Sequence, residues 1–168
     1  GKRATDFGPS AASSSLFGRA EVAIRRKDNA GAATLLAEAF AKTSADTDAV
    51  LRGRIGLQLA AQQKLAGQAE AAQATLVGIK WLPLPADDLA RVHGQLAQIL
   101  LDKGELRPAF DHAVLACLVP EASDGLTGEA KAVARRILAA IEKAAGFTNE
   151  ERLAHREAAG RVRPLSAA

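Results

Sequence analysis

The chain has 168 residues, of which 48% are hydrophobic, so it is long enough to bury the core of a single domain. Its formal net charge is only +3, and basic and acidic residues are interspersed, which argues against a dedicated nucleic-acid surface. The single cysteine excludes an intrachain disulfide, and no apolar run approaches the roughly 18 residues that a membrane span needs. Ala and Leu dominate while Tyr is absent, which favours an all-α fold.

The first helical hairpin is predicted near the N-terminus. Residues 1–12 contain Gly, Pro and Ser without helical periodicity, so we expect a flexible lead-in there and an ordered chain from Ser13. Apolar residues at helical spacing then predict helices over 16–27 and 32–42, separated by the helix-breaking residues 28–31.

A second hairpin is predicted after residues 43–46, whose side chains are expected to cap its first helix. That helix runs to Leu65, Gly67 lies at the turn, and the second helix covers residues 69–79. No strand pattern interrupts this succession of helices.

The segment 81–85, Trp-Leu-Pro-Leu-Pro, is predicted to be non-helical because each proline disfavours helix in the residue before it. We expect Trp81 to fill the gap between the second and third hairpins, rather than to recognise a ligand. The third hairpin is then expected from Asp87 to Pro120, with its turn at Gly104.

The C-terminal part is predicted to close the domain. Residues 129–145 form a long apolar-faced helix, which we interpret as the C-terminal capping helix of a single helical-repeat domain over residues 13–160. Residues 148–151 start a last polar helix, and residues 161–168 are expected to be a frayed basic tail.

Small residues recur at equal distances from the three predicted turns. In the third hairpin, Ala97 lies seven residues before Gly104, Ala109 lies five after it, and Ala116 follows seven later. The corresponding sets are Ala60, Gly67, Ala72 and Ile79 in the second hairpin, and Ala20, Lys27, Ala32 and Ala39 in the first. The turn residues are separated by 40 and then 37 residues, which indicates an internal repeat.

This pattern resembles the tetratricopeptide repeat (TPR), a helical hairpin whose small residues let its two helices pack closely. The residues that carry the resemblance are Ala97, Gly104, Ala109, Ala116 and Pro120. His93 and Leu100 stand where the family has tryptophan and tyrosine, and the spacing exceeds the family's usual period of about 34 residues. Over residues 13–120 the resemblance implies a right-handed stack of about three antiparallel hairpins. Another helical repeat and an irregular bundle remain alternatives.

The resemblance also implies a function, because the first helices of a TPR stack line a concave groove that holds a peptide or helix of a partner. Helical phase directs six polar or basic side chains towards this groove: Arg25, Arg54, Gln58, Arg91, Gln95 and Gln98. Such a lining suits an acidic or carboxylate-bearing segment. We therefore expect a non-catalytic scaffold or adaptor that binds a protein or peptide.

The alternative function is nucleic-acid binding through the basic clusters 25–27, 135–136 and 152–163. These clusters are separated along the chain and lack interleaved aromatic residues, so we interpret them as solvated helix faces. The abundance of Ala, Gly and Arg points to a GC-rich bacterial source. A component of a bacterial assembly is one form that the expected scaffold or adaptor can take.

No catalytic residue, cofactor or metal site is predicted. A Gly-rich phosphate loop is absent from the sequence, and Cys117 lies in an apolar run, where we expect a core thiol with a raised pKa. His93 and His112 fall on consecutive antiparallel helices and can approach each other, yet they lack a third ligand for a metal.

The sequence contains no Met and begins with Gly, so we expect it to be a trimmed form of its translation product. Its localisation is open between the cytoplasm and, if an upstream signal or anchor was removed, the periplasm. The oligomeric state and the identity of the partner are equally open.

Overall fold

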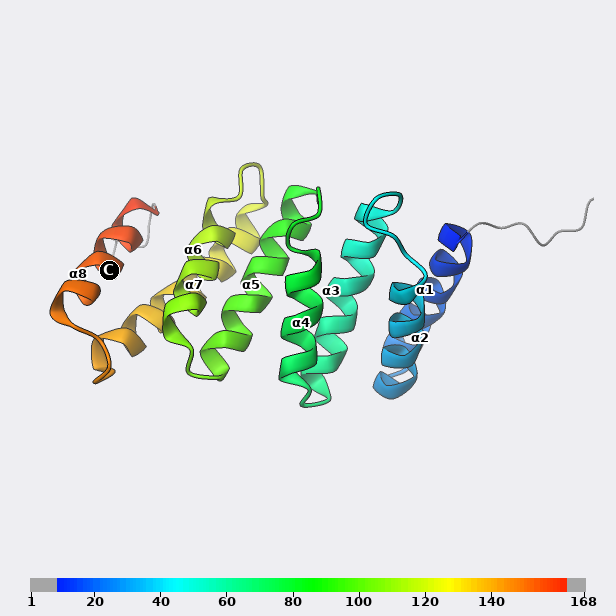
Figure 1. Ribbon diagram of the computed structural model, residues 1–168, viewed down its shortest axis with the longest axis horizontal. Helices are drawn as coiled ribbons and strands as arrows, with labels where there is room; N and C mark the ends of the chain where they lie inside the picture. The colour runs from blue at the N-terminus through cyan, green and yellow to red at the C-terminus, as the bar shows by residue number, and fades with distance from the viewer. Residues whose placement is uncertain (1–8, 163–168) are drawn as a thin grey trace, which may run out of the picture. The chain divides into compact units, whose positions relative to one another are not determined.

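The computed structural model describes residues 9–162, and every regular element in that range is an α-helix, which confirms the all-α prediction (Figure 1). By their contacts the helices form two compact units, divided after Pro85. The helices of the first unit are α1 (Pro9–Arg25), α2 (Asn29–Ala41), α3 (Ala49–Leu65) and α4 (Ala69–Ile79). Those of the second unit are α5 (Ala86–Asp102), α6 (Leu106–Leu118), α7 (Asp124–Lys143) and α8 (Asn149–Arg161).

The N-terminal boundary lies earlier than predicted. Helix α1 begins at Pro9, so residues 9–12 of the expected flexible lead-in are helical, while residues 1–8 lie outside the described residues. Proline is favoured at the first helical position because its fixed φ suits a helix and its missing N–H has no partner there. The fully buried Ser13 then lies inside the helix instead of at its start.

The C-terminal boundary also differs in part. Helix α8 includes Arg161, and Val162 is only 3% exposed, so the expected frayed tail does not begin at residue 161. Residues 163–168 of that tail lie beyond the part of the chain that the structure describes. The single domain over residues 13–160 stays a prediction, because the helices form two compact units.

The first unit contains two helix pairs, each joined by a short turn. Helix α1 packs on α2, α3 packs on α4, and α2 also packs on α3. The buried core cluster of this unit consists of Leu16, Ala20, Leu36, Ala39, Ile55 and Leu59. Because α1, α2 and α3 all contribute to it, the second pair stabilises the first.

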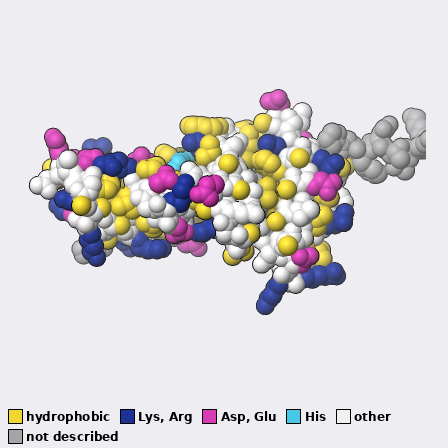
Figure 2. All heavy atoms as spheres, turned by 60° about the horizontal axis from the view of Figure 1, so that its bottom comes forward, with side chains coloured by type: hydrophobic (Ala, Val, Ile, Leu, Met, Phe, Trp, Pro, Cys, Tyr) yellow, Lys and Arg dark blue, Asp and Glu magenta, His cyan; other side chains and the backbone are white. Residues whose placement is uncertain are grey.

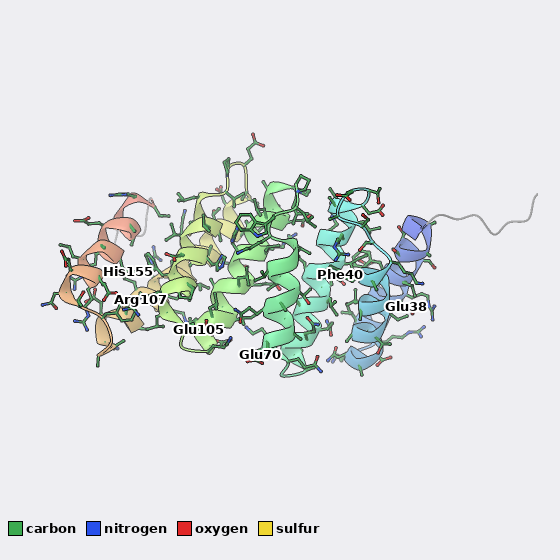
Figure 3. All side chains as sticks on the ribbon, viewed as in Figure 1. Glu38, Phe40, Glu70, Glu105, Arg107 and His155 are labelled. Atoms are coloured by element: carbon green, nitrogen blue, oxygen red, sulfur yellow. The ribbon has the colours of Figure 1, made fainter. Side chains whose placement is uncertain are left out.

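Arg52 of α3 stabilises the C-terminal end of α2 through hydrogen bonds. Its Nη1 donates to the carbonyl oxygens of Phe40 and Thr43, at 2.9 and 2.7 Å, and its guanidinium lies 3.9 Å from the centre of the Phe40 ring (Figure 3). The Phe40 carbonyl lies in the last turn of α2 and also accepts the N–H of Thr43 at 3.2 Å, and the Thr43 carbonyl lies just beyond the helix. The prediction that residues 43–46 cap α3 is wrong: Thr43 donates its hydroxyl to Phe40 instead, and the N-cap of α3 is Asp48, without a side-chain hydrogen bond.

Two glycines of α3 allow neighbouring side chains to reach its backbone. A Cβ at Gly56 would lie 3.0 Å from atoms of Ile79 and 3.1 Å from Phe40, and one at Gly53 would collide with Leu84. The end of α4 and the segment after it therefore pack directly against the main chain of α3.

The three predicted turns share one backbone geometry. Lys27, Gly67 and Gly104 have positive φ angles of 62°, 75° and 77°. In each turn the next residue donates its N–H to a carbonyl five residues back: Asp28 to Ala23, Gln68 to Gln63, and Glu105 to Leu100. This hydrogen-bond pattern satisfies the last carbonyls of the preceding helix and requires the left-handed conformation that glycine adopts without steric cost.

The small residues that mark the predicted repeat are fully buried. Ala20, Ala32, Ala39, Ala60, Ala72, Ile79, Ala97, Ala109 and Ala116 each have an exposed fraction of 0%. Within each helix pair these positions are therefore packed on all sides. The arrangement of the three pairs as one continuous stack stays a prediction.

The second unit contains the third helix pair, α5 and α6, and helix α7 packs against both of its members. Helix α7 begins at Asp124, five residues before the predicted start at residue 129. The shared core cluster consists of Ala97, Leu100, Ala109, Phe110, Ala113, Ala134, Ile137, Ile141, Phe147 and Ala159. Helix α8 packs on α7 and completes the unit.

The N-terminus of α8 is stabilised by a capping box of Thr148 and Glu151, within the predicted helix start at residues 148–151. The Thr148 hydroxyl accepts the N–H of Glu151 at 3.1 Å, and the Glu151 carboxylate accepts the N–H of Thr148 at 2.8 Å. Arg107 of α6 donates to the same carboxylate at 2.7 Å and lies over the ring of Phe147, in the region where Figure 3 labels Arg107 and His155. One exposed carboxylate thus joins α6 to α8.

This carboxylate predicts a pH dependence. The Thr148 N–H, followed by Arg107, lowers the pKa of Glu151 from 4.5 to about 2. A depressed pKa adds stability that is present above the unfolded value and is lost as pH falls from about 4.5 towards 2. We expect the melting temperature of Glu151→Gln to lie below wild type at neutral pH and to converge with it near pH 2. Calorimetry between pH 2 and pH 7 measures these melting temperatures, with Glu150→Gln as the control. The same pH dependence for Glu150→Gln would contradict the prediction.

A second prediction concerns packing. Ala109 is fully buried in the core cluster of the second unit, so Ala109→Leu should overpack it and lower the free energy of unfolding by about 1 to 3 kcal/mol. Ala139→Leu, at an exposed alanine of α7, is the matched control and should change stability little. Equal urea midpoints for the two variants would count against the predicted register of the third helix pair.

Candidate functional site

A surface pocket of about 320 Å³ opens between α1 and α3 in the first unit. Its lining residues are Glu21, Ile24 and Arg25 from α1 and Gln58 from α3. Two of the six predicted groove residues, Arg25 and Gln58, are therefore brought together from the first helices of successive helix pairs. Arg54 is exposed on α3 and is not among the lining residues.

The pocket combines opposite charges with an apolar side chain. Glu21 and Arg25 are four residues apart, so they lie on one face of α1, with Ile24 beside them. Glu21 and Ile24 also line the pocket but are not among the six predicted groove residues. The spacing of Glu21 from Arg25 was the available signal, because residues at i and i+4 share a helix face.

Gln58 contributes an unsatisfied acceptor. Its Oε1 is shielded from solvent and receives no hydrogen bond from the residues that the structure describes. A buried acceptor without a donor costs about 1–3 kcal/mol. Because solvent does not reach this oxygen, a ligand in the open pocket does not reach it either, and Gln58 lines the pocket through its other atoms.

The predicted groove residues of the second unit are held largely by intramolecular contacts. The Nη1 of Arg91 lies 3.2 Å from the carboxylate of Asp88 on its own helix. Gln98 donates to Asp102 at 2.6 Å and accepts from Arg136 of α7 at 3.3 Å, so it lies in the contact between α5 and α7. Gln95 is partly exposed on α5.

His93 and His112 meet across the α5–α6 pair, which confirms that they can approach each other. Their Nδ1 atoms are 2.9 Å apart, and the ring centres are 5.1 Å apart. One ring must carry a hydrogen on Nδ1 while the other accepts it. Within residues 9–162 no group of three or more His, Cys, Asp or Glu side chains is arranged to hold a metal ion.

Cys117 has the character of a structural thiol. Burial raises its pKa, and the positive charge of Lys131 offsets only part of this effect. The raised pKa of Cys117 agrees with the prediction that was made from its apolar surroundings. A raised pKa leaves little of the nucleophilic thiolate at neutral pH.

The basic residues near the C-terminus are engaged within the second unit. Arg156 pairs with Glu142, and Arg152 donates to the carbonyl of Ala144 at the end of α7. On the face that Figure 2 displays, basic and acidic side chains are interspersed instead of being gathered by sign. These contacts explain part of the basic composition without a nucleic-acid ligand.

The prediction that Trp81 fills a gap is wrong, because its side chain is 82% exposed, with the Lys80 ammonium 4.7 Å from the ring centre. Burial alternates along this non-helical segment: Leu82 and Leu84 are partly buried, while Trp81, Pro83 and Pro85 are exposed. The chain turns here, with the N–H of Leu82 donating to Ile79 and that of Leu84 donating to Leu82, and Leu84 packs against Gly53 of α3.

The state of Cys117 is testable by its reaction with a thiol reagent. Because its pKa is raised and its side chain is partly buried, the thiol should react more slowly with a disulfide reagent at pH 8 than free glutathione does. The reaction should reach the glutathione rate in urea, where the chain is unfolded. A rate in the native protein above that of glutathione would indicate an activated thiol instead.

No helix within residues 9–162 is long and apolar enough to cross a membrane. Comparisons of the chain with protein-family models, with curated proteins and with solved structures find no match.

Proposed function

We propose that the protein is a non-catalytic interaction module that holds a segment of a partner protein in the pocket between α1 and α3. The observation that carries this proposal is the convergence of Arg25 and Gln58 from two successive helix pairs. A pocket that offers a cation, an anion, an amide and an aliphatic side chain matches a polypeptide, which presents all the complementary groups.

We further propose that the three helix pairs are repeats of one TPR-like unit, arranged as the right-handed stack that the resemblance implies. The equal turn geometry at Lys27, Gly67 and Gly104 supports this proposal, as does the complete burial of the matching small residues. In such a stack the first helices line the groove, and α1 and α3 are first helices.

An acidic segment is the preferred ligand in this proposal. Arg25 lines the pocket and Arg54 is exposed on the neighbouring helix, so both can contribute to a positive potential there. Nucleic-acid binding is less well supported, because Arg107, Arg152 and Arg156 already bind partners inside the second unit.

The proposal is tested by panning a phage-displayed library of random peptides against the purified protein. We expect enrichment of peptides that contain acidic residues, and Arg25→Glu should weaken their binding about tenfold or more, equivalent to 1.4 kcal/mol. The melting temperature should stay close to wild type, because Arg25 is exposed and exposed charges contribute little to stability.

Arg19→Glu supplies the control, since it reverses an exposed charge on the same helix outside the pocket lining. Its effect on peptide affinity should be small. The proposal fails if no peptide is enriched, or if the Arg19 and Arg25 variants lose affinity equally.

A further inference from the structure

Helix α1 presents a basic face to solvent, with an aliphatic side chain at its centre. Arg19, Val22 and Arg26 are all exposed, and the exposed fraction of Val22 is 41%. Arg26 follows the last residue of α1, but its N–H still bonds to the carbonyl of Val22, so it keeps the helical phase. The three residues are spaced i, i+3 and i+7, which places them on one stripe of the helix.

Helix α8 presents a face of the same pattern and the opposite charge. Glu150, Leu153 and Glu157 are exposed and repeat the spacing of i, i+3 and i+7. Leu153 lies at the centre of this face, with an exposed fraction of 54%. The inner side of α8 is occupied by Ala159, which is 4% exposed and belongs to the core cluster of the second unit. The acidic face therefore points away from that core.

We infer that the chain associates head to tail, with α8 of one copy packed on α1 of the next. The equal spacing lets Leu153 contact Val22 while each glutamate lies beside an arginine of the neighbouring copy. None of these four charged side chains forms an ion pair with another of the described residues. Charge complementarity identifies a second copy as the partner, because two α1 faces repel each other, as do two α8 faces, whereas α1 and α8 attract.

The charges at the helix ends favour an antiparallel contact. In that orientation the start of α8, with Glu150, lies beside the end of α1, with Arg26. The positive end of one helix dipole then lies next to the negative end of the other, which is favourable. Arg161, in the last turn of α8, is kept away from the basic residues 25–27, whereas a parallel contact would bring it towards them.

The contact uses different surfaces on the two copies, so every dimer still has one unused face of each kind. Association therefore continues into an open chain of copies or closes into a ring. Because the contact is a single helix face with exposed charges, it should be weak and sensitive to salt. Neither face includes a pocket-lining residue, so peptide affinity measured on dilute, monomeric protein does not depend on this contact.

The test measures the average mass of the full chain by sedimentation from about 1 µM to about 1 mM protein. The mass should rise with concentration and fall again in about 1 M salt, which screens the charges. Glu150→Arg/Glu157→Arg and Arg19→Glu/Arg26→Glu should each associate about tenfold more weakly or less. An equimolar mixture of these two variants should associate as wild type does, because every contact between unlike copies joins opposite charges.

Glu38→Arg/Glu70→Arg is the matched control. It changes the net charge by the same amount as Glu150→Arg/Glu157→Arg, at exposed glutamates of α2 and α4, and should associate like wild type. Recovery of association in the mixture would also show that both variants are folded. A wild-type chain that stays monomeric at every concentration would overturn the inference. Undiminished association of either variant alone, or a mixture that stays monomeric, would overturn it equally.

Discussion

The close approach of helices at residues without bulky side chains determines how both units pack. Ala20, Ala60 and Ala97 are fully buried, each seven residues before a turn residue, and Gly56 leaves space against Ile79 and Phe40. Helices that approach this closely gain dispersion contacts along their backbones, although each small side chain buries little apolar area by itself. This packing explains how a chain with few aromatic residues builds a dense interior, and it brings α1 close enough to α3 for residues of both to line one pocket.

The helices were predictable because their signals are local. Apolar spacing, the glycines at two turns and the Thr148 capping box act through neighbouring residues, so the sequence contains the required information. Lys27 was identified only by its position in the repeat, since its left-handed conformation is unusual for a residue with a Cβ. The starts of α1 at Pro9 and of α7 at Asp124 were harder to predict, because helix ends depend on contacts with other segments.

The candidate site was only partly predictable, because the accessibility of its side chains also depends on contacts with other segments. Helical phase selected Arg25 and Gln58, which line the pocket, but it also selected Gln98, whose hydrogen bond to Arg136 depends on how α7 packs. The exposure of Trp81 depends on the turn that follows α4 and on the packing of Leu84 against α3, which proline content alone does not specify. Long-range contacts, rather than local propensity, decide which polar side chains remain accessible for binding.

The packing of each helix mainly on its neighbours in the sequence has a consequence for how the chain folds. Within each unit the principal contacts join helices that are adjacent or next but one along the chain, such as α5 with α6 and α7. Closing the short loops between them costs little chain entropy, so we expect a low free-energy barrier to folding. The units should accordingly form on the microsecond to millisecond scale typical of helical proteins rich in local contacts, and a helix pair can begin to form as soon as its second helix has been synthesised.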